Sequence, residues 1–151
     1  MDENDIEEML KDYDYISFEQ IGSENWSVYH LKDSAIIKLK AVPLKLLKRG
    51  NNIILSPMLV QTAFVPRGHR GTPSETPFPT TPEGWEDELT QINIGFDIIN
   101  EPWNEYRIDS GGTFSLKAVA IEFASTKLYD PQREPVYIIN SQILTKKSPM
   151  I

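Results

Sequence analysis

The sequence of 151 residues contains no cysteine and only two histidines, His30 and His69. Without cysteine there is no disulfide bridge, no thiolate zinc site and no thiol nucleophile. Two histidines are too few for a multi-histidine metal site, and no HExxH, GxSxG, Rossmann or EF-hand pattern occurs. We therefore expect no metal and no cofactor. The sequence favours a protein that is not an enzyme, without excluding catalysis.

Long apolar runs are missing as well, since no stretch approaches the roughly 18–20 residues of a membrane helix. The first ten residues, MDENDIEEML, are acidic and so are unlike a signal or transit peptide. These two absences predict a soluble, cytoplasmic protein with no membrane contact. The composition, 40 % hydrophobic and 25 % charged, is that of a globular domain and not of a disordered chain.

The chain is acidic overall, with a formal net charge of −7 and a pI near 4.8, but its charge falls into alternating blocks. Residues 1–25 and 71–109 each hold nine acidic residues and one basic residue. Residues 26–70 hold eight basic residues and one acidic residue, and residues 110–151 hold five and three. Two interpretations follow. The acidic segments offset a basic sheet face within the fold, or the basic block contacts a polyanion and the acidic blocks shield it.

An internal repeat is visible when residues 26–46 are aligned with residues 103–123. Both segments carry W-x-x-Y, then DS, then LKAV, in the same order. The matched aromatic positions are Trp26 with Trp103 and Tyr29 with Tyr106. We interpret the match as a duplication of one unit, at approximately residues 20–65 and 92–146. Because both copies keep these aromatics, we expect them to be core or half-buried residues that define the fold.

Each copy predicts a three-stranded meander, because runs rich in β-branched and aromatic residues are separated by turn sequences. The predicted strands span residues 26–31, 35–48 and 53–65 in the first copy, and 103–108, 114–129 and 135–146 in the second. A further strand is expected at residues 90–98, where apolar and polar residues alternate. Only residues 5–12 have a helical pattern, which predicts a short N-terminal helix.

The two long predicted strands differ at one position. Pro43 has no amide proton, so residues 35–48 form an edge strand, break or bulge there. Ala120 holds the equivalent place in the second copy, so we expect different local geometry in the two copies. Strict alternation over residues 114–129 would place Val119, Ile121 and Phe123 on one face. The opposite face would then carry Phe114, Leu116, Ala118 and Ala120.

The predicted fold is a single, mainly β domain of residues 1–151. A lone three-stranded unit buries little core, so we expect the two meanders to pack about a pseudo-two-fold axis as a barrel or sandwich. Exchange of strands between the halves would be compatible with the sequence but leaves no signal in it. Exposed edge strands also make self-association an option.

The two copies are joined by a proline- and glycine-rich loop at residues 66–85, for which we expect no regular structure. Its simplest role is a flexible tether. Arg67, His69 and Arg70 offer two guanidiniums and an imidazole, so the loop is also a candidate site for a phosphate or carboxylate. Residues 79–82 satisfy PxxP, a weak signal for docking to an aromatic groove.

A basic strand face is the clearest candidate site. Its residues are Lys38, Lys40, Lys45, Lys48 and Arg49, on the same predicted strand and near Trp26, Tyr29 and His30. Basic groups beside aromatic rings resemble platforms for single-stranded nucleic acid. The acidic pI argues against a dedicated nucleic-acid binder, and lysines on an edge strand also discourage aggregation.

An acidic cluster beside Trp85 consists of Glu83, Glu86, Asp87 and Glu88. We interpret it as solvated surface in preference to a site for catalysis or cation binding. Taken together, the sequence predicts a non-enzymatic binding or assembly module. It would present the basic strand face and the flexible loop to a macromolecule, either a protein partner or another copy of itself. The first alternative is single-stranded nucleic-acid binding through residues 38–49. The second is an enzyme for a phosphorylated or acidic small molecule that uses residues 67–70.

Overall fold

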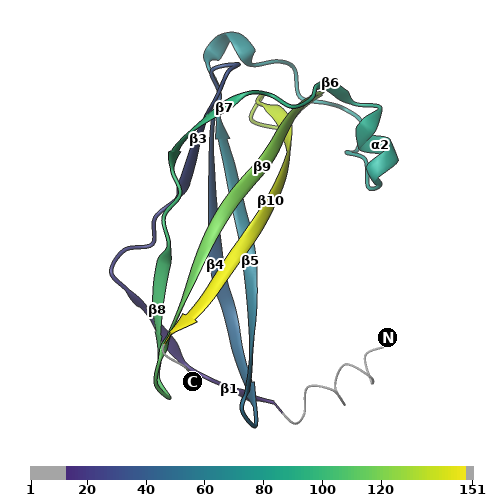
Figure 1. The fold of residues 1–151 in the computed structure, drawn as a ribbon. Coiled ribbons are helices and arrows are strands. Elements are labelled where there is room, and N and C mark those ends of the chain that lie inside the picture. The colour runs from purple at the N-terminus through teal and green to yellow at the C-terminus, as the bar shows by residue number, and fades with distance from the viewer. Residues whose placement is uncertain (1–12, 149–151) are drawn as a thin grey trace.

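The computed structural model describes residues 13–148, and most of them lie in ten β-strands (Figure 1). The strands are β1 (Asp14–Tyr15), β2 (Phe18–Ile21), β3 (Ser27–Leu31), β4 (Ile36–Arg49), β5 (Asn52–Phe64), β6 (Leu89–Gln91), β7 (Phe96–Asn100), β8 (Asn104–Ile108), β9 (Thr113–Tyr129) and β10 (Pro135–Ser148). A 3₁₀ helix, η1 (Arg67–His69), and a short helix, α2 (Pro82–Glu86), complete the described elements. The mainly β prediction is confirmed. The predicted helix at 5–12 lies outside the described residues.

The strands form two antiparallel sheets with the same arrangement. In sheet A, β4 is central, β5 pairs with one side of it, β1 and β3 share the other side, and β7 lies outside β3. In sheet B, β9 is central, β10 pairs with one side, β6 and β8 share the other, and β2 lies outside β8. The sheets pack against each other and do not join into a closed barrel within residues 13–148. No described helix is long and apolar enough to cross a membrane.

The outermost strands cross between the sheets. β2 precedes β3 in the chain but pairs with β8, where Phe18 lies opposite Ile108. β7 precedes β8 but pairs with β3, where Phe96 lies opposite Leu31. Each predicted meander is therefore completed by a strand that belongs, in sequence, to the other half.

Both long strands contain a β-bulge. In β4 the register shifts between Pro43 and Lys45, which leaves Leu44 without a partner on β5. This outcome is one of those predicted for Pro43. In β9 the register likewise skips Ile121, at the equivalent position. The expectation that the two copies differ here is wrong, because a bulge requires an unpaired residue and not a proline.

The bulge in β9 also corrects the predicted faces of that strand. An extra residue reverses the alternation of side chains beyond it. Phe123 is therefore fully buried on the same side as Ala118 and Ala120, while Ile121 is 47 % exposed. The prediction from strict alternation, that Phe123 shares a face with Val119 and Ile121, is therefore wrong.

The predicted strand at residues 90–98 is broken into β6 and β7. Asn93 adopts a positive φ of 51°, a left-handed conformation that ends the extended backbone. This turn allows Ile94 to point into the core, where it is buried and its amide donates to the carbonyl of Phe123 (3.0 Å). Alternating hydrophobicity alone did not reveal the turn.

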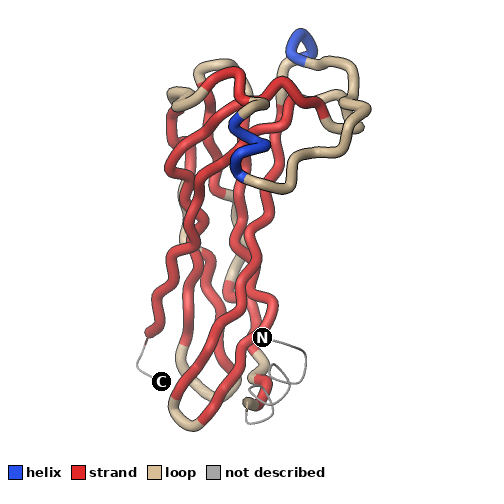
Figure 2. The backbone as a smooth tube through the Cα atoms, turned by 90° about the vertical axis from the view of Figure 1, so that its right-hand side faces the viewer, coloured by secondary structure: helices blue, strands red, loops and turns tan. Residues whose placement is uncertain are grey.

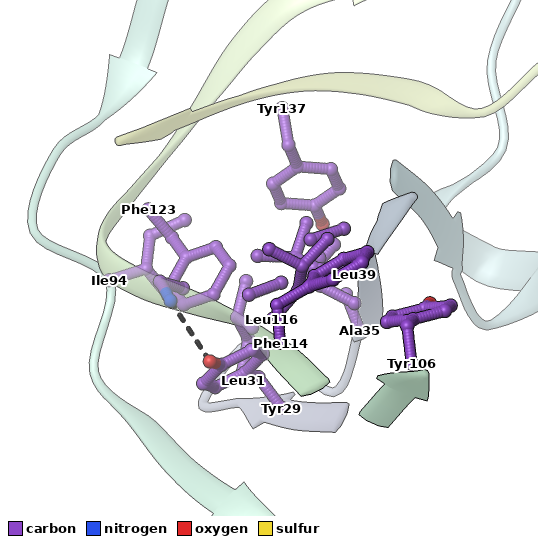
Figure 3. Packing of buried hydrophobic residues seen from close by; sticks show 14 of the residues in the cluster. Tyr29, Leu31, Ala35, Leu39, Ile94, Tyr106, Phe114, Leu116, Phe123 and Tyr137 are labelled. Carbon is purple, nitrogen blue, oxygen red and sulfur yellow. Dashed lines mark hydrogen bonds between the residues drawn. The ribbon is translucent and has the colours of Figure 1, made fainter. Parts of the chain in front are cut away.

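Tyr29 and Tyr106 are two of the buried tyrosines of the core (Figure 3). The Tyr29 hydroxyl donates to Glu101 (2.5 Å) and accepts from the Ala120 amide (2.9 Å). The Tyr106 hydroxyl donates to Glu24 (3.1 Å). Glu101 precedes β8 in the second half, and Glu24 precedes β3 in the first half. Each tyrosine is therefore hydrogen-bonded to a carboxylate from the other half of the chain.

Aromatic contacts repeat this reciprocity. The Phe96 ring meets the Tyr29 ring edge-on at 5.7 Å, and the Phe18 ring meets the Tyr106 ring edge-on at 6.1 Å. Phe96 and Phe18 are contributed by the exchanged strands β7 and β2. Each exchanged strand therefore contributes a ring that contacts one tyrosine, and it also pairs with the strand that carries that tyrosine.

The buried tyrosines resist ionisation. Burial raises the pKa of Tyr29, Tyr106 and Tyr137 far above the usual value of about 10. A neighbouring carboxylate raises each pKa further: Glu101 acts on Tyr29, Glu24 on Tyr106 and Asp33 on Tyr137.

We expect Tyr29→Phe to lower the free energy of unfolding by about 1–3 kcal/mol, because it leaves the Ala120 amide and the Glu101 carboxylate without this partner. Urea denaturation followed by circular dichroism measures the change. Tyr15→Phe is the matched control, since the Tyr15 side chain is 73 % exposed, and it should change the free energy by less than about 0.5 kcal/mol. Equal effects of the two substitutions would contradict this assignment.

Stability should fall steeply above pH 10. Tyrosines of the unfolded chain ionise there while the buried ones stay protonated, so proton release favours unfolding. The stabilisation is fully present below pH 10, and each buried tyrosine costs up to roughly 1.4 kcal/mol per pH unit above it. Urea unfolding at pH 8, 10 and 11 measures the slope. Tyr29→Phe should show a shallower slope than the parent protein, and identical slopes would exclude Tyr29 from the effect.

Candidate functional site

Strand β4 divides its side chains between the core and a basic outer surface. Leu39 and Ala41 point inward and are buried, so the alternating Lys38 and Lys40 point outward. The bulge resets the alternation, and Lys45 follows on the outside before buried Leu46. We call the outer surface of sheet A around Lys38, Lys40 and Lys45 the basic face.

Each of the three lysines lies over an aromatic ring. The Nζ–ring-centre distances are 5.2 Å for Lys38 over Phe64, 4.4 Å for Lys40 over Trp26 and 5.7 Å for Lys45 over Tyr15. These distances are within the range of cation–π attraction, which is worth about 0.5–1 kcal/mol at exposed sites. The lysines and rings therefore form one row along β4.

Three different strand regions supply the rings. Trp26 immediately precedes β3, Phe64 ends β5 and Tyr15 belongs to β1. Phe64 lies opposite Ile36 on β4, which brings its ring beside Lys38. Of these rings only Trp26 was predicted from the sequence. Phe64 and Tyr15 were not, because periodicity does not reveal which strands pair with β4. The run of residues 53–65 is largely apolar and shows no alternation that would have placed Phe64 on the outer surface.

No carboxylate within residues 13–148 forms an ion pair with the three lysines of the basic face. The nearby acid on β7, Asp97, instead pairs with Lys32 (3.4 Å). Exposed Tyr15 and Phe64 are 73 % and 51 % accessible, so ring surface as well as charge is available to a ligand.

Sheet B carries a related but more acidic surface. The Trp103 ring lies below Lys117 (5.1 Å) and Lys146 (4.4 Å). Two carboxylates, exposed Glu105 on β8 and half-buried Glu122 on β9, lie on the strands of the same sheet. Sheet A also carries two carboxylates on its strands, Asp14 and Asp97, but neither forms an ion pair with Lys38, Lys40 or Lys45. What distinguishes sheet A is therefore the row of three lysines over rings.

The remaining basic residues predicted on this strand lie at its end. The Arg49 guanidinium lies 5.8 Å from the centre of the Tyr13 ring, so Arg49 extends the row. Lys48 precedes Arg49 on β4, so its side chain points to the opposite side of the strand. It lies opposite Asp14 on β1 and is half-buried. His30 is exposed on β3, opposite Asp97.

The other predicted candidates do not join the basic face. Tyr29 and Tyr106 are buried in the core, as described above. Arg67, His69 and Arg70 are all exposed, in and directly after η1. No hydrogen bond or ion pair among the described residues draws these three side chains together around a common point. Residues 13–148 also contain no group of three or more His, Asp and Glu side chains placed to hold a metal ion.

The loop at 66–85 is attached to sheet B, which corrects the expectation that it lacks structure. The Gly71 amide donates to the Arg133 carbonyl (3.0 Å), and the Ser74 amide donates to the Tyr129 carbonyl (3.1 Å). The loop also contains η1 and α2. Its first half is therefore held against the turn between β9 and β10.

Gly71→Ala should release this attachment, because the added Cβ would lie 2.5 Å from the Tyr129 ring. We expect a loss of about 1–3 kcal/mol in the free energy of unfolding and faster proteolysis within residues 66–85. Gly68→Ala is the matched control, since its Cβ would meet nothing within 4 Å. If both variants are cleaved at the parent rate, the packing of Gly71 on Tyr129 does not hold the loop.

The geometry thus places lysines and aromatic rings in one row on the outer surface of sheet A. Comparison of the chain with protein-family models, with curated proteins and with solved structures finds no match.

Proposed function

We propose that the chain is a non-enzymatic binding module whose basic face binds single-stranded nucleic acid. The row of Lys38, Lys40 and Lys45, each over an aromatic ring and none paired with a carboxylate, is the observation that supports this proposal. A single strand of nucleic acid matches this row, because it offers phosphates to the lysines and unpaired bases to the rings.

The two kinds of group have separate roles in this proposal. The lysines contact phosphates, and this contact is independent of base sequence and depends on salt. Phe64 and Tyr15 offer exposed ring surface on which bases stack, a contact worth about 1–3 kcal/mol per base. Because the chain is acidic as a whole, we expect modest affinity confined to this face.

We also infer that the two halves arose by duplication and are related by a pseudo-two-fold axis. The pairs Glu24 and Glu101, Trp26 and Trp103, Tyr29 and Tyr106, and Lys40 and Lys117 share one sequence spacing and make matching contacts. In this view the halves keep the same core and the same Lys–Trp pair. They differ in the charge of their outer surfaces, so the binding role belongs to sheet A.

Fluorescence anisotropy with a labelled single-stranded oligonucleotide, repeated at several salt concentrations, tests the function. We expect log affinity to fall linearly with log salt. The triple variant Lys38→Glu, Lys40→Glu and Lys45→Glu should weaken binding at least tenfold and flatten the salt slope by about one unit for each lost phosphate contact. Phe64→Ala should weaken binding without changing the slope.

Lys127→Glu is the control, because this lysine lies on sheet B and pairs with Glu88 (3.6 Å). It should leave affinity within about twofold of the parent. Binding that is absent at low salt, or that the triple variant leaves unchanged, would exclude the basic face as a nucleic-acid site.

A further inference from the structure

A second surface, distinct from the basic face, is a groove between sheet B and the segment that contains α2. The groove has a volume of about 650 Å³. Its floor is formed by residues of β9 and β10, including Ala124, Val136 and Ile138, and its wall by Phe78, Trp85 and Leu89. Figure 2 shows α2 alongside the strands near one end of the molecule. We call this site the α2 groove.

The wall of the α2 groove is held in place by its own contacts. The Phe78 and Trp85 rings meet at 5.9 Å, and Thr81 Oγ1 accepts from the Gly84 amide (3.1 Å) at the start of α2. Beyond the helix, the Lys127 amide donates to the Glu88 carbonyl (2.9 Å). The groove is therefore a preformed feature of the chain.

The charged groups that line the α2 groove are all acidic. Glu86 and Glu122 are the carboxylates, Gln61 and Asn140 are neutral amides, and no Lys, Arg or His lines the space. The hydroxyl of Tyr137, the remaining titratable group, donates to Asp33 (2.7 Å). A positively charged group placed among these carboxylates and the two aromatic rings gains both ionic and cation–π attraction.

The groove continues beyond Phe78. An adjoining cavity of about 320 Å³ is also lined by Gln61, Phe78 and Tyr137. It adds Asp130 and Glu134 and again no basic residue. Together the two cavities are lined by apolar residues of β10 and by four carboxylates, a lining suited to a chain with apolar and basic side chains.

A strand edge lies along the same space. Among the described residues, β10 pairs with β9 alone, and Val136, Tyr137 and Ile139 line both cavities. Gln61 on β5 lines both cavities as well. An extended peptide can therefore hydrogen-bond to the backbone of β10 while its side chains enter the groove.

We propose that the α2 groove binds an extended segment of a partner protein that carries alternating basic and apolar side chains, added along the edge of β10. The apolar side chains pack beside Tyr137 and Ile139 on one face of β10, and the basic side chains, which alternate with them, reach Glu86 and Glu122 on the other face. This site is independent of the basic face and does not require that the chain bind nucleic acid.

Trp85 provides a local reporter for a binding test. The substitutions Trp26→Phe and Trp103→Phe leave Trp85 as the only tryptophan, because the sequence contains three. The probe is a nine-residue peptide of alternating Lys and Val, and a Glu–Val peptide of the same length is the control ligand. We expect the Lys–Val peptide to change Trp85 emission saturably and the Glu–Val peptide to leave it unchanged.

Two pairs of variants with the same change in net charge separate the groove from general attraction to an acidic protein. The double variant Glu86→Gln with Glu122→Gln should lower the affinity for the Lys–Val peptide at least fivefold. The double variant Glu75→Gln with Glu105→Gln changes exposed carboxylates outside the groove, so it should lower the affinity for this peptide less than twofold. Gln61→Lys, which places a cation at the rim, should weaken it as well and serves as the second test of the site.

Equal weakening by the two pairs of variants would overturn the proposal, as would an unchanged Trp85 signal or equal binding of the Glu–Val peptide. The lysine triple variant of the basic face should bind the Lys–Val peptide at least as well as the parent. This result would separate the α2 groove from the nucleic-acid proposal.

Discussion

The hydroxyl groups of Tyr29 and Tyr106 are the constraint on which the fold depends. Both lie inside the core, where a hydroxyl without a hydrogen-bond partner would cost about 1–3 kcal/mol or more. Their partners, Glu101 and Glu24, belong to the opposite halves of the chain. The crossing of β2 and β7 brings these carboxylates, with the rings of Phe18 and Phe96, to the tyrosines. Core packing, sheet pairing and polar satisfaction therefore require both halves at once.

The position of the basic face follows from the same core. Leu39 and Ala41 are committed to the interior, so the pleat of β4 directs Lys38 and Lys40 outward. The bulge at Leu44 keeps Leu46 in the core and Lys45 on the outer surface. A sheet packed on one side only thus leaves its second side available for charged and aromatic groups. The candidate site is rigid because it is the reverse side of the core.

Much of this architecture was predictable from the sequence. The W-x-x-Y and LKAV matches located four of the meander strands. Pro43 predicted an edge strand, a break or a bulge, and the structure shows the bulge. The bulge at Ile121 was missed because no proline or glycine marks it, and the turn at Asn93 was hidden by an alternating pattern. Strand exchange was not predictable, because periodicity describes which side of a strand is apolar and not which strand lies beside it. Tyr15 was missed for the same reason.

The exchanged strands also have a consequence for synthesis of the chain. Phe18 lies opposite Ile108 in the register of β2 and β8, so β2 cannot pair until β8 has been synthesised. The first half likewise leaves a ribosome with an incomplete sheet A, because one edge of β3 is unpaired until β7 has been synthesised. Contacts between residues so distant in sequence slow folding, because a long loop must close before they are gained. The protein is therefore most exposed to aggregation and to misplaced strand pairing while it is half made.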